Sequence, residues 1–328
     1  MLSLSKYQDM GESVQAFWEN REPPPRAEKD TIVAVTGDGK GIPIRPDGCK
    51  RMSVIGAVYN IQPYQRTPQD VLEALFAEPG KKKEGTEARP SPIAKYVRAS
   101  LERDEEGTMQ PSYDNVFAWL AEEVRLRDPK QTQPLVVVMD GQETLWNAGR
   151  QHLSGNAIEI LDLLHATGYV RKAAALFYCE AGHQEMFAKF AIGYLLRGEV
   201  ATVLEILDIW GEEAKLTGNK KEELRIIRGY LNKNTDRMRY DEYLAAGYPI
   251  ASGVIEGACR YVIKDRMERT GMRWSMSGAQ TMLELRCISV NEEWEAFMSF
   301  HVDQENQRLY PWRAANDEDI SLPLSQAA

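Results

Sequence analysis

Several features that define common protein classes are missing from this 328-residue sequence. No apolar run approaches the roughly 18 residues that a membrane-spanning helix needs, and the N-terminus lacks the basic start and apolar stretch of a secretory signal. The four cysteines include no Cys-x-x-Cys pair, which argues against a zinc knuckle and against a disulfide framework. Neither a Gly-x-Gly-x-x-Gly motif nor a Walker loop occurs, so a nucleotide cofactor has no support. We therefore expect a cytoplasmic protein whose cysteines are reduced and buried.

An overall excess of basic residues is also missing, since the formal net charge is −9. Proteins that coat duplex DNA normally carry a basic footprint. The charge is nevertheless unevenly distributed. Residues 260–273 hold five basic and two acidic residues, a net charge of +3, and residues 215–239 hold eight basic and three acidic residues, a net charge of +5. Both segments are candidate phosphate-contacting surfaces, although solvated helices of mixed charge have the same composition.

With 43% hydrophobic and 27% charged residues, the composition is that of a globular protein. The chain exceeds the size at which one hydrophobic core usually stops growing, which favours one large domain with an insertion, or two domains. The patterns divide the chain into an N-terminal helix with a Pro-rich linker (1–30), a first part of an α/β core (31–165), an all-helical insertion (166–250), the final helices of the core (251–312) and a tail (313–328).

Apolar runs bounded by turn residues predict the strands of the core. Residues 31–36 and 42–46 flank the sequence GDGKG and predict a hairpin, and residues 52–63 predict a third strand. The continuous apolar run 134–139 and the segment 157–161 predict two strands buried in the sheet. Helical patterns are expected after Pro68, around 93–101, at 115–127, at 143–152 and from about 166 to 246.

Two aspartates follow apolar runs that we expect to be strands. Asp38 comes shortly after residues 31–36, and Asp140 comes directly after residues 134–139. In an open α/β sheet, active sites lie outside the carboxyl ends of the strands, and two residues at such ends of adjacent parallel strands lie roughly 5 Å apart. Such a pair could share a metal ion. An Asp-Gly pair after a strand is equally typical of a simple turn.

Glu256 lies in the first turn of a helix that Ser252 is expected to cap, where the helix dipole favours a carboxylate. Arg260 and Lys264 follow at i+4 and i+8 on the same face. The opposite side carries Val254, Ala258, Tyr261 and Val262. The helix could therefore pack on a sheet and present Glu256 with a basic stripe, although intrahelical ion pairs on a solvated face fit the same spacing.

Asp162 and His165 form an Asp-x-x-His unit after the strand predicted at 157–161. A lone histidine is more often a packing or hydrogen-bonding residue than a ligand. Farther along the chain, Ser277 and Gln280 have the spacing of a capping box for a helix that follows.

Residues 248–274, YPIASGVIEGACRYVIKDRMERTGMRW, closely resemble the signature block of the ISKra-type insertion-sequence transposases, relatives of the Mutator-like elements. Further matches are TGDGKGIPI at 36–44, MSVIGAVYNIQPYQRTPQDV from Met52, VVVMDGQETLW from Val136, ILDLLH from Ile160 and WEAFMSFHVDQENQRLYP ending at Pro311. The resemblance covers most of the chain from about residue 31 to residue 311.

This resemblance implies a ribonuclease-H-like α/β fold, in which a mixed sheet of three antiparallel and two parallel strands is flanked by helices and interrupted by an all-helical insertion. It places the catalytic, metal-binding carboxylates at Asp38, Asp140 and Glu256. Asp162 and His165 fall on the Asp-x-x-His motif of the Mutator-like relatives and are expected to support the site. The basic segment supplies the expected DNA-binding residues, Arg260, Lys264, Arg266, Arg269 and Arg273.

The function that this resemblance implies is that of a bacterial DDE transposase. It would use two Mg²⁺ ions, or Mn²⁺ in their place, to cut double-stranded DNA at the terminal repeats of a transposon and to join the ends to target DNA. We expect a homo-oligomer on DNA, associated with the nucleoid, because two ends must be brought together.

Two other interpretations stay open. Few residues precede the first strand, whereas family members usually carry a longer N-terminal region, so the chain could be a truncated, catalytically idle remnant that binds DNA as a regulator. An unrelated phosphotransferase using Asp38 is disfavoured, because Lys40 stands where an Asp-x-Asp pair needs its second aspartate.

Overall fold

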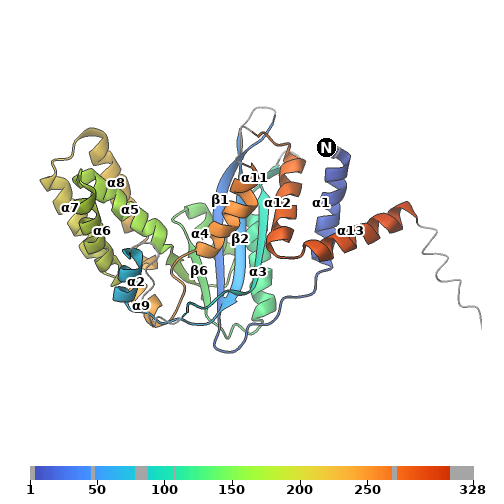
Figure 1. The fold of residues 1–328 in the computed structure, drawn as a ribbon, viewed down its shortest axis with the longest axis horizontal. Helices are drawn as coiled ribbons and strands as arrows, with labels where there is room; N and C mark the ends of the chain where they lie inside the picture. Colours follow the sequence, from blue (N-terminus) through green and yellow to red (C-terminus); the bar gives the residue numbers. More distant parts are fainter. Residues whose placement is uncertain (1–3, 46–48, 78–87, 106–107, 268–271, 311–328) are drawn as a thin grey trace, which may run out of the picture.

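The computed structural model describes residues 4–45, 49–77, 88–105, 108–267 and 272–310. At its centre is a five-stranded mixed sheet with the strand order β3-β2-β1-β6-β7 (Figure 1). Its strands are β1 (Ile32–Pro43), β2 (Lys50–Ile61), β3 (Ile93–Leu101), β6 (Leu135–Met139) and β7 (Ile158–Leu161). β2 is antiparallel to β1 and β3, while β6 is parallel to β1 and β7. The expected α/β class, a mixed sheet flanked by helices, is confirmed.

The predicted hairpin between residues 31–36 and 42–46 is wrong. β1 runs without a break from Ile32 to Pro43, and each of its residues pairs with one residue of β2. The GDGKG sequence stays extended because β2 satisfies its backbone hydrogen bonds, which a local turn would otherwise have to do.

The helix predicted around residues 93–101 is also wrong, because this segment is the edge strand β3. Val97, Ala99 and Leu101 alternate along it and are buried on one face of the sheet. Pairing with β2 decides the conformation, since strand preference depends on the surface that a segment packs against. A separate two-stranded sheet of β4 (Arg103–Glu105) and β5 (Thr108–Gln110) follows.

One face of the five-stranded sheet is covered by α3 (Ser112–Arg127) and α4 (Glu143–His152). Their buried side chains pack on Val33, Val35 and Val137. Both helices lie where the sequence predicts them.

The other face is covered in two parts. The first is the helical insertion, here residues 163–245, with α5 (Leu163–Phe177), α6 (Ala181–Leu196), α7 (Val200–Glu213), α8 (Gly218–Lys233), the short η1 (Thr235–Arg237) and α9 (Tyr240–Ala245). Together with α2 (Pro68–Leu75), which Thr67 caps, it forms one core with Ile32, Val136 and Val138 of the sheet. Figure 1 shows α6, α7 and α8 standing to one side of the sheet.

The second part lies over β1, β2 and β3. It consists of α10 (Gly253–Cys259), the π-helical turn η2 (Arg260–Lys264), α11 (Asp265–Met267) and α12 (Met276–Val290). Outside α12 lie α1 (Leu4–Glu19) and α13 (Trp294–Leu309), which share a small core around Phe297. α12 is capped by Ser275, so the capping box predicted at Ser277 and Gln280 is wrong.

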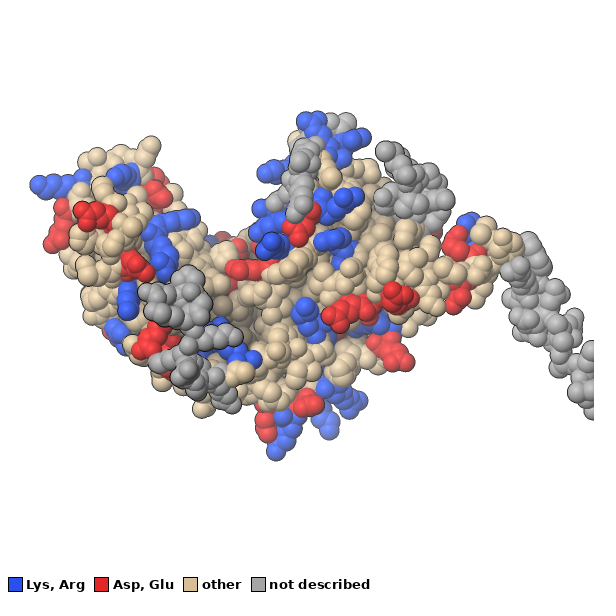
Figure 2. Space-filling view, viewed as in Figure 1, with Lys and Arg blue, Asp and Glu red and all other residues tan. Residues whose placement is uncertain are grey.

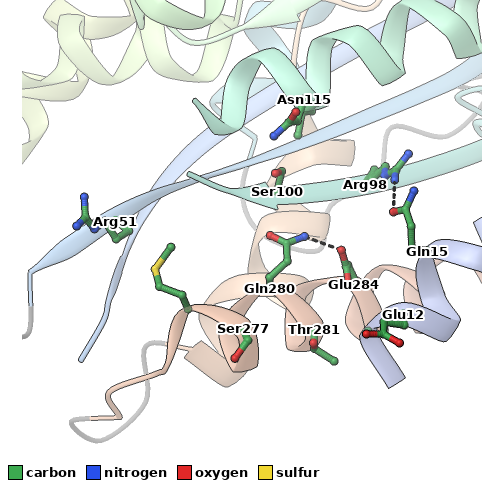
Figure 3. Close-up of a pocket in the computed structure, with 13 residues that line it drawn as sticks. Glu12, Gln15, Arg51, Arg98, Ser100, Asn115, Ser277, Gln280, Thr281 and Glu284 are labelled. Carbon is green, nitrogen blue, oxygen red and sulfur yellow. Dashed lines mark hydrogen bonds between the residues drawn. The ribbon is translucent and has the colours of Figure 1, made fainter. Parts of the chain in front are cut away.

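Side chains of α12 and the residue after it cover the outer edge of β3. Asn291 accepts the Val97 N–H at 2.9 Å and donates to the Val97 carbonyl at 3.0 Å. Gln280 accepts the Leu101 N–H at 2.8 Å and donates to Glu284, a bond drawn in Figure 3. These side chains occupy backbone hydrogen-bonding positions that an added strand would need. Among the described residues, no helix is long and apolar enough to cross a membrane.

Candidate active site

Asp38 and Asp140 lie on adjacent strands at the same level of the sheet. The parallel register of β1 and β6 ends at the pair Gly37 and Met139, and the next residues along the two strands are Asp38 and Asp140. Neighbouring strands are about 5 Å apart. The prediction that the first strand ends near Asp38 is wrong, because β1 continues to Pro43 along β2. Asp38 instead lies at the level where β6 ends.

The carboxyl group of Asp140 lies among other charged groups. Burial raises its pKa above the usual value, and the nearby negative charges of Asp38 and Asp162 act in the same direction. The Gln142 N–H, which donates to Asp140 Oδ1 at 3.0 Å, and His165 partly oppose this rise in pKa. The charges of Asp38, Asp162 and His165 therefore act on Asp140, and a cation beside Asp38 and Asp140 would relieve the repulsion between these carboxylates.

The backbone of Asp140 is held by a chain of side chains from the core. The indole Nε1–H of Trp146 donates to the Asp140 carbonyl at 2.7 Å. The guanidinium of Arg237 lies 4.4 Å from the centre of the Trp146 ring, and its Nε donates to Glu159 at 2.6 Å. The position of Asp140 thus depends on packing well outside its own strand.

Asp162 is fully buried, and both of its oxygens accept hydrogen bonds from the protein. Oδ1 accepts the N–H groups of Leu164 at 2.6 Å and His165 at 3.3 Å, which caps α5. Oδ2 accepts the Ser252 N–H at 2.8 Å and the Ser252 hydroxyl. The prediction that the Ser252 side chain caps its own helix is therefore wrong. Its hydroxyl binds Asp162, which in this way supports the start of α10.

Glu256 is exposed on α10. One turn later, Cys259 is fully buried, and its thiol lies close enough to Asp38 for the carboxylate to influence the pKa of the thiol. Burial raises the pKa of the Cys259 thiol to about 12, and the charge of Asp38 adds to the effect. This proximity of Cys259 to Asp38 was not predicted from the sequence, where the only signal is the i+3 spacing of Cys259 from Glu256 on the helix.

The donor set suits a hard cation only in part. Asp38 and Asp140 offer carboxylate oxygens, the ligands that Mg²⁺ and Mn²⁺ prefer. In the part of the chain that the structure describes, however, no group of three or more His, Cys, Asp or Glu side chains is arranged to hold a metal ion. The structure brings Asp38 and Asp140 together, and Glu256 lies with an exposed side chain on α10, which packs against β1.

A basic surface lies beside these carboxylates. The charges of Lys264 and Lys40 act on the Cys259 thiol and partly oppose the rise in its pKa. Figure 2 shows Lys and Arg gathered over the end of the molecule formed by β1, β2 and the α10–α12 segment. Its exposed members are Arg45, Lys50, Arg260, Lys264, Arg266 and Arg273. Arg269 lies outside the described residues.

We call these six residues the basic end. Arg45 follows β1 and Lys50 begins β2, and the bond from the Arg45 N–H to the Trp274 carbonyl, at 2.8 Å, joins this end of the sheet to the segment of Arg273. Arg45 and Lys50 were not predicted, because they are isolated charges that only the folded β1–β2 hairpin places beside residues 260–273.

The second basic segment, 215–239, is mostly neutralised by ion pairs. Arg225 pairs with Glu222, Arg228 with Asp208, Lys233 with Glu143, Arg237 with Glu159 and Arg239 with Glu242. These ion pairs favour the interpretation of residues 215–239 as a solvated surface of mixed charge over that of a phosphate-contacting surface. Lys215, Lys220 and Lys221 remain exposed at the end of the helical insertion that faces away from the sheet.

A groove of about 950 Å³ lies on another part of the molecule, between α1, β3, α3 and α12 (Figure 3). Its charged residues are Glu12, Arg51, Arg98 and Glu284. None of the predicted site residues lines it, so it is separate from the carboxylate pair.

Comparison with protein-family models gives no match to this chain, and comparison with curated proteins gives none either.

Proposed function

We propose that this protein is a DDE transposase, a metal-dependent enzyme that cuts DNA and joins the cut ends to a target. The observation that carries the proposal is the pairing of Asp38 and Asp140 at the point where the parallel strands β1 and β6 part. The sheet order, with three antiparallel strands followed by two parallel ones, supports a ribonuclease-H-like core.

In this proposal Asp38 and Asp140 hold the metal, and Glu256 is the third ligand. When bound, Mg²⁺ or Mn²⁺ supplies charge neutralisation and Lewis-acid activation at the phosphodiester. Glu256 is the proposed third ligand because its helix, α10, packs against β1, the strand that carries Asp38. Asp162 holds the start of α10 through Ser252 and so determines where Glu256 stands.

The proposed substrate is double-stranded DNA, at the ends of a transposon and at the target. The basic end would neutralise backbone phosphates beside the carboxylates. Lys264, Arg266 and Arg273 make no ion pair with any residue in the described part of the chain, so their charge is available for this role. Since two DNA ends must meet, we propose that the enzyme acts as a homo-oligomer on DNA.

The experiment is cleavage of labelled transposon-end DNA by the purified protein in Mg²⁺. We compare the natural chain with Asp140→Asn and with Asp303→Asn, a matched control on the exposed face of α13. The natural chain and the control should cut, and Asp140→Asn should not. Equal cutting by Asp140→Asn would remove Asp140 from the site.

A second candidate is a catalytically idle relative that binds DNA as a regulator. The buried Cys259 thiol near Asp38 favours it, because Mg²⁺ prefers oxygen ligands. The same experiment separates the two functions: an idle protein binds the DNA and leaves it uncut in both Mg²⁺ and Mn²⁺.

A further inference from the structure

The residue after Asp140 is a glycine whose free side is occupied by a tyrosine of the helical insertion. A Cβ atom added to Gly141 would lie 2.2 Å from Cε2 and 2.8 Å from Cζ of the Tyr230 ring. Real Cβ atoms essentially never approach another heavy atom so closely, so only glycine leaves room for this ring. Tyr230 belongs to α8 and reaches the loop that follows β6 from outside the sheet.

Tyr230 is itself held by an aromatic stack. Its ring lies on the ring of Tyr169 in α5, with 3.8 Å between the ring centres and 19° between the planes. The ammonium group of Lys172 lies 4.9 Å from the centre of the Tyr169 ring. Stacked aromatic pairs of this kind stabilise their own geometry beyond the area they bury. The two helices therefore present Tyr230 in a defined place.

Side chains from two elements therefore contact the backbone around Asp140 on two sides. Trp146 of α4 holds the Asp140 carbonyl from the core, and Tyr230 presses on Gly141 from the helical insertion. The Tyr230 hydroxyl is buried against the Gly141 backbone at a geometry that makes no regular hydrogen bond. The ring carbon Cε2 makes the closest approach to the built Cβ position, so we assign the contact to the ring.

We propose that Tyr230 is a positioning residue, through which the helical insertion holds Asp140 in place for metal binding by way of Gly141. This inference rests on the proposed function, because it takes Asp140 to be a metal ligand. Any movement of α8 relative to the sheet, including one caused by DNA on the insertion, would then change the metal site directly.

The test is the affinity of the full chain for Mn²⁺ alone, measured by electron paramagnetic resonance. Tyr230→Ala should weaken Mn²⁺ binding by about 10-fold, as loss of an outer support of a metal ligand does. Tyr230→Phe keeps the ring and should bind Mn²⁺ as the natural chain does. Tyr194→Ala is the matched control: this tyrosine of α6 also packs in the insertion, against Phe190.

Gly141→Ala provides a second, independent variant. Its added methyl group should displace the Tyr230 ring and weaken Mn²⁺ binding as Tyr230→Ala does. In the double variant the ring is gone, so the methyl group should cost no further affinity. This non-additivity is the sign of a direct contact. It does not arise if each change merely destabilises the fold.

The outcomes separate the two proposals. If the natural chain binds no Mn²⁺, or if Asp140→Asn binds it equally well, the proposed function fails. If Asp140→Asn abolishes binding while Tyr230→Ala and Tyr194→Ala bind equally, only the positioning role fails. If Tyr230→Phe is as weak as Tyr230→Ala, the hydroxyl is responsible and the assignment to the ring is wrong.

Discussion

Ser252 donates both its backbone N–H and its hydroxyl to Oδ2 of Asp162, a residue 90 positions earlier in the chain. The chain enters the helical insertion directly after Asp162 and leaves it just before Ser252. A single buried carboxylate therefore joins the two ends of the insertion. It also fixes the start of α10, the helix that carries Glu256 and Cys259.

This relationship predicts unequal effects of two substitutions on stability. Asp162→Asn should lower the free energy of unfolding by about 3 kcal/mol or more, because an amide NH₂ group would face buried N–H and O–H donors. Ser252→Ala removes one donor and should cost about 1–2 kcal/mol. Urea denaturation measures both changes, with the exposed Asp303→Asn as control. Equal stability of Asp162→Asn and the natural chain would contradict the assigned role.

The basic end predicts a change in the salt dependence of DNA binding. Replacing Lys264 and Arg266 by Ala should reduce the slope of log affinity against log salt by about 2, because each lost phosphate contact removes about 0.9. Fluorescence anisotropy with duplex DNA over a range of salt concentrations measures this slope.

The matched control for that experiment is the pair Arg125→Ala and Lys130→Ala. Both residues are exposed, at the helix α3 and the loop after it, and α3 covers the opposite face of the sheet. Their removal takes away the same total charge. A slope that falls equally in both double variants would mean that DNA binds through general charge and not through the basic end.

Glu293, at the start of α13, predicts a pH-dependent stability. Its Oε2 is buried without a hydrogen-bond partner, and burial raises the pKa of the carboxyl group from 4.5 to about 7. Protonation of Glu293 therefore stabilises the folded state. This contribution to the free energy of unfolding is fully present below about pH 4.5 and is lost as the pH rises through about 7. Glu293→Gln should be more stable than the natural chain at pH 8, and equal to it at pH 4.

The size of this effect is of order 1–2 kcal/mol, because the side chain is partly exposed and solvent screens its charge. Chemical denaturation at several pH values measures it. The idea is refuted if the natural chain and Glu293→Gln keep the same difference in stability at pH 4 and pH 8.

The buried ion pairs of Glu123 predict an order of stabilities. Glu123 pairs with Arg127 at 3.0 Å and also with Arg21, while the Arg127 side chain is fully buried. Glu123→Gln leaves the Arg127 guanidinium without its counter-ion and should cost about 3–5 kcal/mol. Arg127→Met should cost less, because Glu123 keeps Arg21 as a partner. Thermal unfolding ranks the two variants, and the reverse order would show that Arg21 does not neutralise Glu123.

The sequence alone was sufficient to predict the helices and strands whose stabilising interactions are local. The buried strand at 134–139 is marked by a continuous apolar run with Pro134 before it and Asp140 after it. The helix after Thr67 carries its own capping box with Asp70, and α4 begins and ends where its pattern predicts. The α/β class and the long helical stretch followed from the change in periodicity, which is a property of neighbouring residues.

The remaining strands and the arrangement of the candidate site depended on contacts with residues far away in the chain. β3 is a strand because β2 lies beside it, and β1 continues through three glycines for the same reason. Only the register of β1 and β6 brought Asp38 level with Asp140. The partners of Asp162 and Gly141, namely Ser252 and Tyr230, come from segments whose own sequence carries no sign of the contact. Hydrogen-bond partners and packing neighbours of this kind exist only once the chain has folded, since no local pattern specifies which distant atoms will meet.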